Sequence, residues 1–206
     1  GKSTVAKLIL RFYDVTGGKI TMEGSDIRDI SGEELRSHIA YVPQKAWLFS
    51  GTVADNLRYG NTSASDEELC HALSVAQSDF VFSLPKGLDS PVAQGGTNFS
   101  GGQKQRLSIA RALVKKADLF VFDDSFSALD FKTDAALRHA LAEETKDSAV
   151  LIIAQRISTI LHAEKIIVLN EGRIAGIGRH EELLKSCPVY RDIVNSQMKS
   201  GAENGQ

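Results

Sequence analysis

The sequence predicts an α/β fold in which helices cover a largely parallel sheet, with an α-helical subdomain inserted into the chain. Two observations carry this prediction. In the last third of the chain, apolar runs typical of strands covered on both faces alternate with helical stretches. Residues 46–115, by contrast, contain little strand signal. We therefore expect a core made of residues 1–45 and 116–198, a helical subdomain of residues 46–115, and a disordered polar tail of residues 199–206.

The first third of the chain contains short elements separated by turn residues. Apolar residues at helical spacing predict the first helix, and a serine followed three residues later by glutamate predicts the start of the next one. The expected elements are, in order, a helix over residues 3–12, a turn at Gly17-Gly18, a short strand over residues 19–23, a short helix after Ser31, and a strand over Ile39 to Val42 that ends at Pro43.

The rest of the chain divides into a helical part and an alternating part. Residues 66–77 form an amphipathic pattern with three acids at its beginning, where the helix dipole is positive. Residues 85–96 are rich in loop-forming Pro and Gly. Further on we expect strands over residues 119–122, 149–154 and 166–169, and helices over residues 133–145 and 156–162.

Composition excludes several classes of protein. The chain has 206 residues, of which 42% are hydrophobic and 24% charged, which is ordinary for a globular domain. A formal net charge of −2 gives no broad basic face, so we expect no nucleic-acid partner. Cys70 and Cys187 stand far apart and are expected to be isolated thiols. The apolar runs are far shorter than the ~20 residues of a membrane span, so we expect a soluble domain that can dock onto a membrane protein.

The chain begins with Gly1-Lys2-Ser3-Thr4, which matches the end of a phosphate-binding loop of the form G-x-x-x-x-G-K-[ST]. In such a loop the lysine reaches the phosphates and the hydroxyl binds Mg²⁺. Four residues can also match by chance. The interpretation therefore requires the other parts of a nucleotide site elsewhere in the chain.

Two further motifs are candidates for those parts. Asp123 and Asp124 follow a buried strand, and ligands bind at the carboxyl ends of strands in open α/β sheets. An acid there can hold Mg²⁺, although a solvated loop acid gives the same pattern. Ser100 can cap the helix that begins at Gly101-Gly102, and the free N–H groups of a helix start suit a phosphate. Taken alone, a plain capped helix accounts for it equally well.

The combination is more specific than its parts. GKST, Gln44 after a strand, FSGGQKQR, LFVFDD and SALD occur in one order, followed by a polar residue after the strand VLIIA. Together they resemble the nucleotide-binding domain of the ATP-binding-cassette (ABC) family over nearly the whole chain. The resemblance implies a P-loop NTPase core with ATP and Mg²⁺ as ligands, and it implies that N-terminal strands of that core are missing from these residues.

The resemblance also implies roles for individual residues. Gly1 to Thr4 correspond to the end of Walker A, where Lys2 contacts the β- and γ-phosphates and Ser3 binds Mg²⁺. Gln44 corresponds to the glutamine that senses Mg²⁺ and couples to the membrane domain, and Asp123 to the Walker B aspartate. In this family Ser100, Gly101, Gly102 and Gln103 contact the ATP held by the opposite subunit, and Asp130 ends a loop that crosses the dimer interface.

The stretch from Trp47 to Gly60 resembles that of exporters, where it faces a membrane domain. This implies a transmembrane domain fused upstream and a location at the cytoplasmic face of the cell membrane. Trp47 and Phe49 are then expected on a partner surface, although an aromatic pair after a turn is more often part of a core.

Two residues depart from the family pattern. Asp124 stands where the family usually has Glu, and its shorter side chain draws the carboxylate back by about an ångström, which can cost ~10²-fold in rate. Gln155 stands where the family usually has His, and it cannot become a cation. Both changes together resemble the degenerate site of heterodimeric exporters. They predict a slow site in this chain, whose signature residues complete a competent site on a different partner.

Three alternatives remain at this point. One is a soluble ABC ATPase that is not linked to transport, which a basic face or a long coiled-coil insert would favour. The second is a nucleotide-gated regulatory module with little hydrolysis, which Asp124 and Gln155 favour. The third is an unrelated phosphate-loop kinase, in which the FSGGQ sequence has no role. Because the glycines that open a phosphate loop are not among these residues, we expect weak or no ATP binding by the 206 residues alone.

Overall fold

The computed structural model describes residues 1–203, with side chains described through Met198. The last residues of the expected polar tail, 204–206, lie outside this part. The backbone of residues 199–203 continues the final helix into the segment for which we expected disorder.

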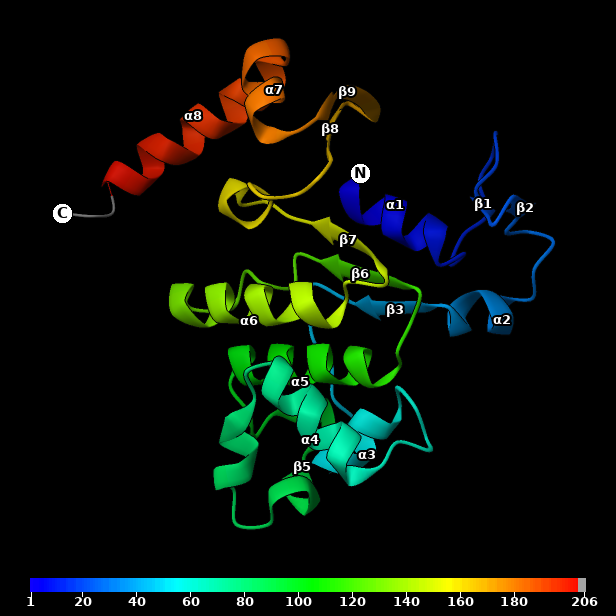
Figure 1. Ribbon diagram of the computed structural model, residues 1–206, viewed down its shortest axis with the longest axis vertical. Helices are drawn as coiled ribbons and strands as arrows, with labels where there is room; N and C mark the ends of the chain where they lie inside the picture. Colours follow the sequence, from blue (N-terminus) through cyan, green and yellow to red (C-terminus); the bar gives the residue numbers. More distant parts are fainter. Residues whose placement is uncertain (204–206) are drawn as a thin grey trace.

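A three-stranded parallel sheet lies at the centre of the molecule (Figure 1). Its strands are β3 (Ile39–Val42), β6 (Leu119–Asp123) and β7 (Ala149–Ile153), with β6 in the middle. Ile39 lies opposite Leu119, and Leu119 lies opposite Ala149, so the three carboxyl ends meet at one edge. The expected fold class, a mixed α/β fold with a parallel sheet and helices, is confirmed.

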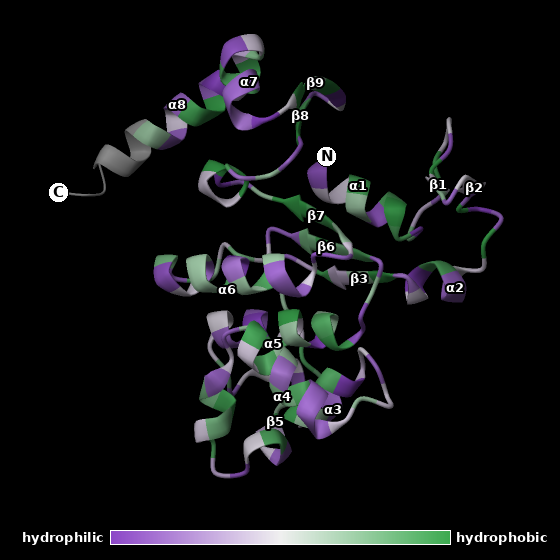
Figure 2. Cartoon of the chain, viewed as in Figure 1, coloured by the Kyte–Doolittle hydropathy of each residue, from purple (hydrophilic) through white to green (hydrophobic). Residues whose placement is uncertain are grey.

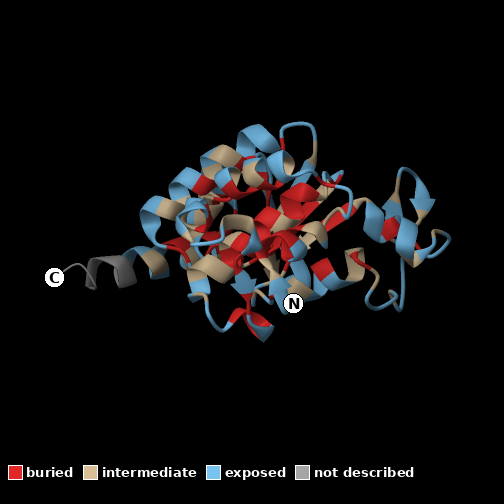
Figure 3. Ribbon diagram, turned by 90° about the horizontal axis from the view of Figure 1, so that it is seen from below, coloured by how far each residue is buried: buried red, intermediate tan, exposed pale blue. Residues whose placement is uncertain are grey.

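The two faces of the sheet are covered by different helices because alternate side chains of a strand point in opposite directions. One face packs against α1 (Lys2–Ile9) and α2 (Gly32–Ser37), and the other against α5 (Gly101–Val114) and α6 (Phe131–Glu144). Phe122 on the second face is 1% exposed, and burial of such a side chain contributes about 1.5–3 kcal/mol. Figure 2 shows the apolar character of the strands, and Figure 3 shows the buried residues between the helical layers.

The helical segment packs beneath this sheet (Figure 1). Its apolar residues and those of the lower sheet face form one continuous cluster, which extends from Leu69 and Leu73 to Phe120 and Phe122. Two very short strands that we did not expect, β4 and β5, pair here as an antiparallel bridge. The elements of this segment are β4 (Gly51–Thr52), α3 (Val53–Arg58), α4 (Asp66–Val75), η1 (Asp79–Ser83), η2 (Gly87–Asp89), β5 (Pro91–Val92), η3 (Gln94–Gly96) and α5.

A second, smaller apolar cluster lies in the C-terminal part of the chain. The hairpin of β8 (Ile166–Asn170) and β9 (Arg173–Gly178) packs against α7 (His180–Ser186) and α8 (Pro188–Glu203). Only β8 among these four elements was expected. The cysteines are free, and Cys187 is buried in this cluster while Cys70 lies on α4.

Several expected boundaries differ from the structure. The helix expected over residues 156–162 is only a 3₁₀ turn, η4 (Ile157–Thr159), because side chains from two helices bond its backbone in place of a helical ladder. The first helix ends at Ile9 rather than at Phe12, since Arg11 has a left-handed backbone with φ of 52°. The strand expected over residues 19–23 is reduced to β1 (Thr21–Met22), which pairs with β2 (Ser25–Asp26). Ser31 caps α2 by accepting from the Glu34 N–H.

Candidate functional site

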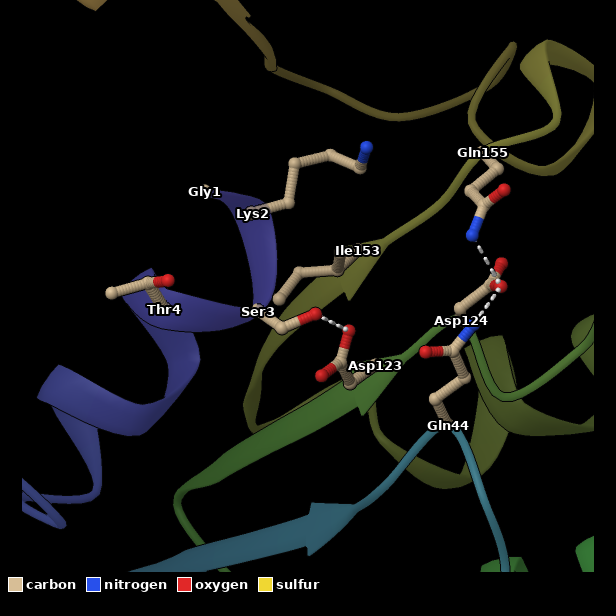
Figure 4. Close-up of a pocket in the computed structure, with 9 residues that line it drawn as sticks. All are labelled: Gly1, Lys2, Ser3, Thr4, Gln44, Asp123, Asp124, Ile153 and Gln155. Carbon is tan, nitrogen blue, oxygen red and sulfur yellow. Dashed lines mark hydrogen bonds between the residues drawn. The ribbon is translucent and has the colours of Figure 1, made fainter. Parts of the chain in front are cut away.

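One pocket lies where the carboxyl ends of the three parallel strands meet the start of α1 (Figure 4). This is the position at which ligands bind to open α/β sheets. The pocket brings together the expected Walker A and Walker B residues with Gln44, Asp124 and Gln155. It is lined by Gly1, Lys2, Ser3, Thr4, Gln44, Asp123, Asp124, Ile153 and Gln155.

The start of α1 supplies the positive side of the pocket. Gly1 is the N-cap residue and provides no side-chain cap, so the N–H groups of Lys2 and Ser3 have no partner within the helix. The positive end of the helix dipole and the Lys2 ammonium add to these donors. This edge of the pocket is suited to an anion such as phosphate.

Ser3 and Asp123 form the polar floor of the pocket. The Ser3 hydroxyl donates to Asp123 Oδ1 at 2.9 Å, and the Asp123 residue is only 3% exposed. The Tyr41 hydroxyl donates to the other oxygen, Oδ2, at 3.3 Å. Burial and the Asp123 charge raise the pKa of Tyr41 to about 12, so the phenol stays protonated and remains a donor. A hydroxyl and a carboxylate side by side are hard oxygen ligands that fit Mg²⁺.

Asp124 is held by two glutamine side chains. Gln44 Nε2 and Gln155 Nε2 each donate to the same oxygen, Asp124 Oδ2, at 3.0 Å (Figure 4). The Asp124 backbone is left-handed, with φ of 50°, and its N–H donates to the Ile153 carbonyl at 2.7 Å. Asp occupies this backbone region more readily than longer side chains do. The carboxylate is therefore fixed by donors from the ends of two other strands.

The signature residues lie apart from this pocket. Ser100 Oγ accepts from the Gln103 N–H at 3.2 Å, and Gln103 Oε1 accepts from the Ser100 N–H at 2.9 Å, which forms a capping box at the start of α5. A Cβ at Gly101 would meet nothing within 4 Å, whereas one at Gly102 would lie 3.3 Å from the Ala128 carbonyl. None of residues 100–103 lines the pocket at Lys2, so the structure does not bring the two sets of expected ligands together.

Asp130 does not line the pocket either. Its carboxylate caps α6 by accepting from the Thr133 N–H at 2.9 Å, and this bond lowers the pKa of the Asp130 side chain.

Trp47 and Phe49 are 52% and 43% exposed, as a partner surface would require. The Arg111 guanidinium donates to the Trp47 carbonyl at 3.0 Å and lies 5.8 Å from the centre of the Phe49 ring.

Sequence reasoning missed three residues that support the site. Tyr41 contacts Asp123, and Ile153 forms a wall of the pocket. Gln105 is buried on α5 and donates to the Pro43 carbonyl at 3.2 Å, directly before Gln44. A signal existed for Tyr41, because it lies on an expected strand three residues before Gln44. Gln105 gave no signal, since its partner depends on tertiary packing.

Comparisons with known proteins agree with this geometry. Residues 1–127 match the family model that describes ABC transporters. An uncharacterised ABC transporter ATP-binding protein of Mycobacterium tuberculosis is 47% identical over 208 residues, which cover 100% of this chain and 36% of that protein. An ATP-dependent lipid A-core flippase of Albidiferax ferrireducens is 44% identical and covers 96% of this chain, which spans 34% of the flippase.

A solved structure gives the same result. The structure of a bacterial Atm1-family ABC exporter with ATP bound matches with a TM-score of 0.93 and 38% identity, over 96% of this chain and 35% of that one. The chain thus spans about a third of the length of the relatives it matches. Among the described residues, no helix has both the length and the apolar character needed to cross a bilayer. From the family match, the identity to these relatives and the shared fold, the chain belongs to the ABC transporter family as a nucleotide-binding domain with exporter-type homologues.

Proposed function

We propose that this chain is one of two facing ATP-binding domains of an ABC exporter, and that its own Walker site hydrolyses ATP slowly. The slow hydrolysis is inferred from the hydrogen bonds of Asp124, whose carboxylate accepts from the side-chain amides of both Gln44 and Gln155. The matches to exporters support the first part.

Lys2 and the first N–H groups of α1 bind the phosphates of ATP in this proposal. Ser3 and Asp123 hold Mg²⁺, with Gln44 as a further oxygen ligand near them. Bound Mg²⁺ supplies positive charge that neutralises the phosphate oxygens. Tyr41 keeps the Asp123 carboxylate oriented towards Ser3, since it donates to the oxygen that Ser3 does not use.

Slow hydrolysis follows from the donors around Asp124. A general base must be within reach of the water whose proton it takes. Asp124 is one methylene shorter than Glu, and two amide donors already occupy one of its oxygens at 3.0 Å. Gln155 can donate to a phosphate but cannot carry a proton to or from it. Together these features remove about 10²-fold or more from the rate of the chemical step.

The start of α5 serves the other subunit. Its capping box is complete and its N-terminus lies outside the chain's own pocket, so it is free to contact an ATP molecule held by a facing domain. The partner that benefits must carry its own base, so the proposal requires a heterodimer. Asp130 lies at the same interface. ATP favours the closed pair because it contacts both domains only there.

Coupling to transport uses the exposed surface at Trp47 and Phe49. It belongs to the helical subdomain, which we assign to residues 46–115, and it would face a membrane domain fused upstream at the cytoplasmic face of the cell membrane. Gln105 connects α5 to the segment before Gln44, which ties the signature helix to the pocket. An alternative with the same support at Asp124 is a regulatory module that binds nucleotide and hydrolyses almost none.

The test is retention of uncleaved ATP by the full-length heterodimer. The complex is loaded with Mg-ATP labelled on the γ-phosphate, freed of excess nucleotide, and sampled over time. We expect one of its two bound nucleotides to keep the label long after the other has lost it. A Lys2→Ala variant should lose the long-lived pool. Equal loss of label from both sites would contradict the proposal.

A further inference from the structure

The C-terminal helix α8 reaches the loop that carries Gln155. Gln197 Nε2 donates to the Gln155 carbonyl at 2.6 Å, and Gln197 Oε1 accepts from the Ile157 N–H at 2.9 Å. One side-chain amide thereby bonds the backbone on both sides of Arg156, much as a neighbouring strand would. α8 also contacts η4.

This loop depends on outside partners for its shape. It forms only the short turn η4 after β7, and Arg156 is extended, with φ of −88° and ψ of 127°. A side chain of α6 also bonds the backbone of this loop, since Arg138 Nη1 donates to the Ser158 carbonyl at 3.1 Å. Two helices therefore fix the backbone from which the Gln155 side chain extends.

Gln197 is itself held in place by the apolar face of its helix. Tyr190 and Val194 are 1% and 4% exposed and belong to the cluster with β8 and α7. Residues 190, 194 and 197 fall at helical spacing on one side of α8. The Tyr190 hydroxyl also lies 2.8 Å from His180 Nδ1, which joins α8 to α7. The packing of α8 thus sets where the Gln197 amide lies.

We infer that Gln197 is a positioning residue for Gln155, so that the C-terminal helix controls the amide pair that holds Asp124. The connection runs from α8 through Gln197 to the Gln155 backbone, and from the Gln155 side chain to Asp124 Oδ2 at 3.0 Å. This inference rests on the proposed function, in which Gln155 can donate to a phosphate of ATP; we take this to be the terminal one, which ADP lacks. Movement of α8 would then alter how strongly the site distinguishes ATP from ADP.

The chemistry at position 197 is restrictive. Only a side chain with one donor and one acceptor at this reach satisfies both backbone groups. Gln197→Met keeps the length but leaves the Gln155 carbonyl and the Ile157 N–H without this partner. Gln197→Glu keeps the acceptor for Ile157 and places a carboxylate against the Gln155 carbonyl. Met198→Gln is the matched control, because Met198 is 69% exposed on the same turn.

The first measurement needs no nucleotide. Hydrogen exchange of the peptide that spans residues 155–159, in the full-length protein, should become at least about 5-fold faster in Gln197→Met and stay unchanged in Met198→Gln, since the lost bond contributes about 1 kcal/mol. Unchanged exchange in both Gln197 variants would overturn the inference and leave the proposed function intact.

The second measurement is the ratio of the dissociation constants for Mg-ADP and Mg-ATP at this chain's site. Gln197→Met and Gln197→Glu should each lower that ratio by about 5-fold, mainly by weakening ATP. In a Gln155→Ala background the same substitutions should change the ratio less than about 2-fold, because their effect passes through Gln155. A merely structural role would lower the melting temperature equally in both backgrounds without this dependence.

The binding measurements distinguish a failure of the proposed function from a failure of the inference about Gln197. If the wild-type protein binds no Mg-ATP, the proposed function fails and the inference fails with it. If the wild-type protein prefers ATP, and the Gln197 variants keep that preference or lose it equally in the Gln155→Ala background, the inference alone is wrong. Should Gln197→Met fail to fold, Gln197→Glu carries the same tests.

Discussion

The pocket at the ends of the parallel strands differs from the N-terminus of α5 in how its polar groups are used. In the pocket, Ser3 bonds Asp123, and Gln44 and Gln155 bond Asp124, so the acids are occupied by partners from the same chain. At the start of α5 the Ser100–Gln103 capping box serves only the helix itself, and the space around Gly101 is open. The acids of the pocket are paired within the chain, whereas the start of α5 leaves open space, as its proposed contact with an ATP molecule of a facing domain requires.

This contrast predicts that damage to the open half-site affects the complex most. In Gly101→Asp a carboxylate is added at the start of α5, where nothing lies within 4 Å, so the chain should fold. We expect turnover of the heterodimer to fall by about 10²–10³-fold, the size of effect seen when donors that stabilise transition-state charge are lost. The measurement is steady-state ATP hydrolysis. Gly17→Asp is the control, because Gly17 also has open space around it and an ordinary backbone. Unchanged turnover in Gly101→Asp would contradict the proposal that the start of α5 contacts the ATP molecule of a facing domain.

Removal of the buried carboxylate should affect only the chain's own pocket. Asp123→Asn removes the charge beside Ser3 while keeping the size of the side chain. We expect the Mg²⁺-dependent part of ATP affinity at this site to fall by about 10²-fold, since a hard cation prefers carboxylate oxygen. A titration of Mg²⁺ with a fluorescent ATP analogue measures this. Asp124→Asn should leave the Mg²⁺ dependence within a factor of about 2–3; equal losses in the two variants would show that the two acids do not have separate roles.

The smallest expected effect concerns Tyr41. Its pKa is raised to about 12 in the folded state against 10.0 for the free side chain, so the unfolded chain ionises first. The contribution of Tyr41 to stability is complete below pH 10 and is lost as the pH rises to about 12. Denaturant titrations at several alkaline pH values should show a steeper loss of the free energy of unfolding in wild type than in Tyr41→Phe. Parallel losses would mean that Tyr41 is not buried against Asp123.

Much of the site was predictable because it follows from strand ends and caps. Ile39–Val42 and Leu119–Asp123 are compact apolar strands, so Gln44, Asp123 and Asp124 had to lie near one sheet edge once the pairing was parallel. Ser100 and Gln103 carry a local capping pattern that depends on no distant residue. The prediction that the pocket and the start of α5 contact different ATP molecules rests on the family resemblance and not on the spacing of the residues.

The missed features share a physical cause. β9 contains two glycines and few buried residues, so its sequence Arg173–Gly178 lacks an alternating pattern and is defined by pairing with β8. Residues 156–162 have helical periodicity, yet Arg138 and Gln197 bond the backbone there and shorten it to one turn. Tyr41 and Asp123 share a sheet face because of register, which a single sequence does not reveal. The pairing of β9 is local, whereas the other two outcomes are decided by contacts between segments that are distant in the sequence.

The sharpest measurement concerns hydrolysis at the chain's own pocket. We expect Gly101→Asp to suppress turnover at the partner's site, so the residual turnover of that heterodimer should report the pocket at Lys2. Adding Asp124→Glu and Gln155→His should raise the residual turnover by about 10–10²-fold, because a base then reaches the water and an imidazole, unlike the Gln155 amide, can carry a proton or a positive charge. Glu at the left-handed position costs stability of about 1–2 kcal/mol, which a thermal melt monitors separately. A folded heterodimer with all three substitutions whose residual turnover does not rise would contradict the proposal of a slow site. A wild-type pocket that already hydrolyses ATP as fast as the partner's site would contradict it too.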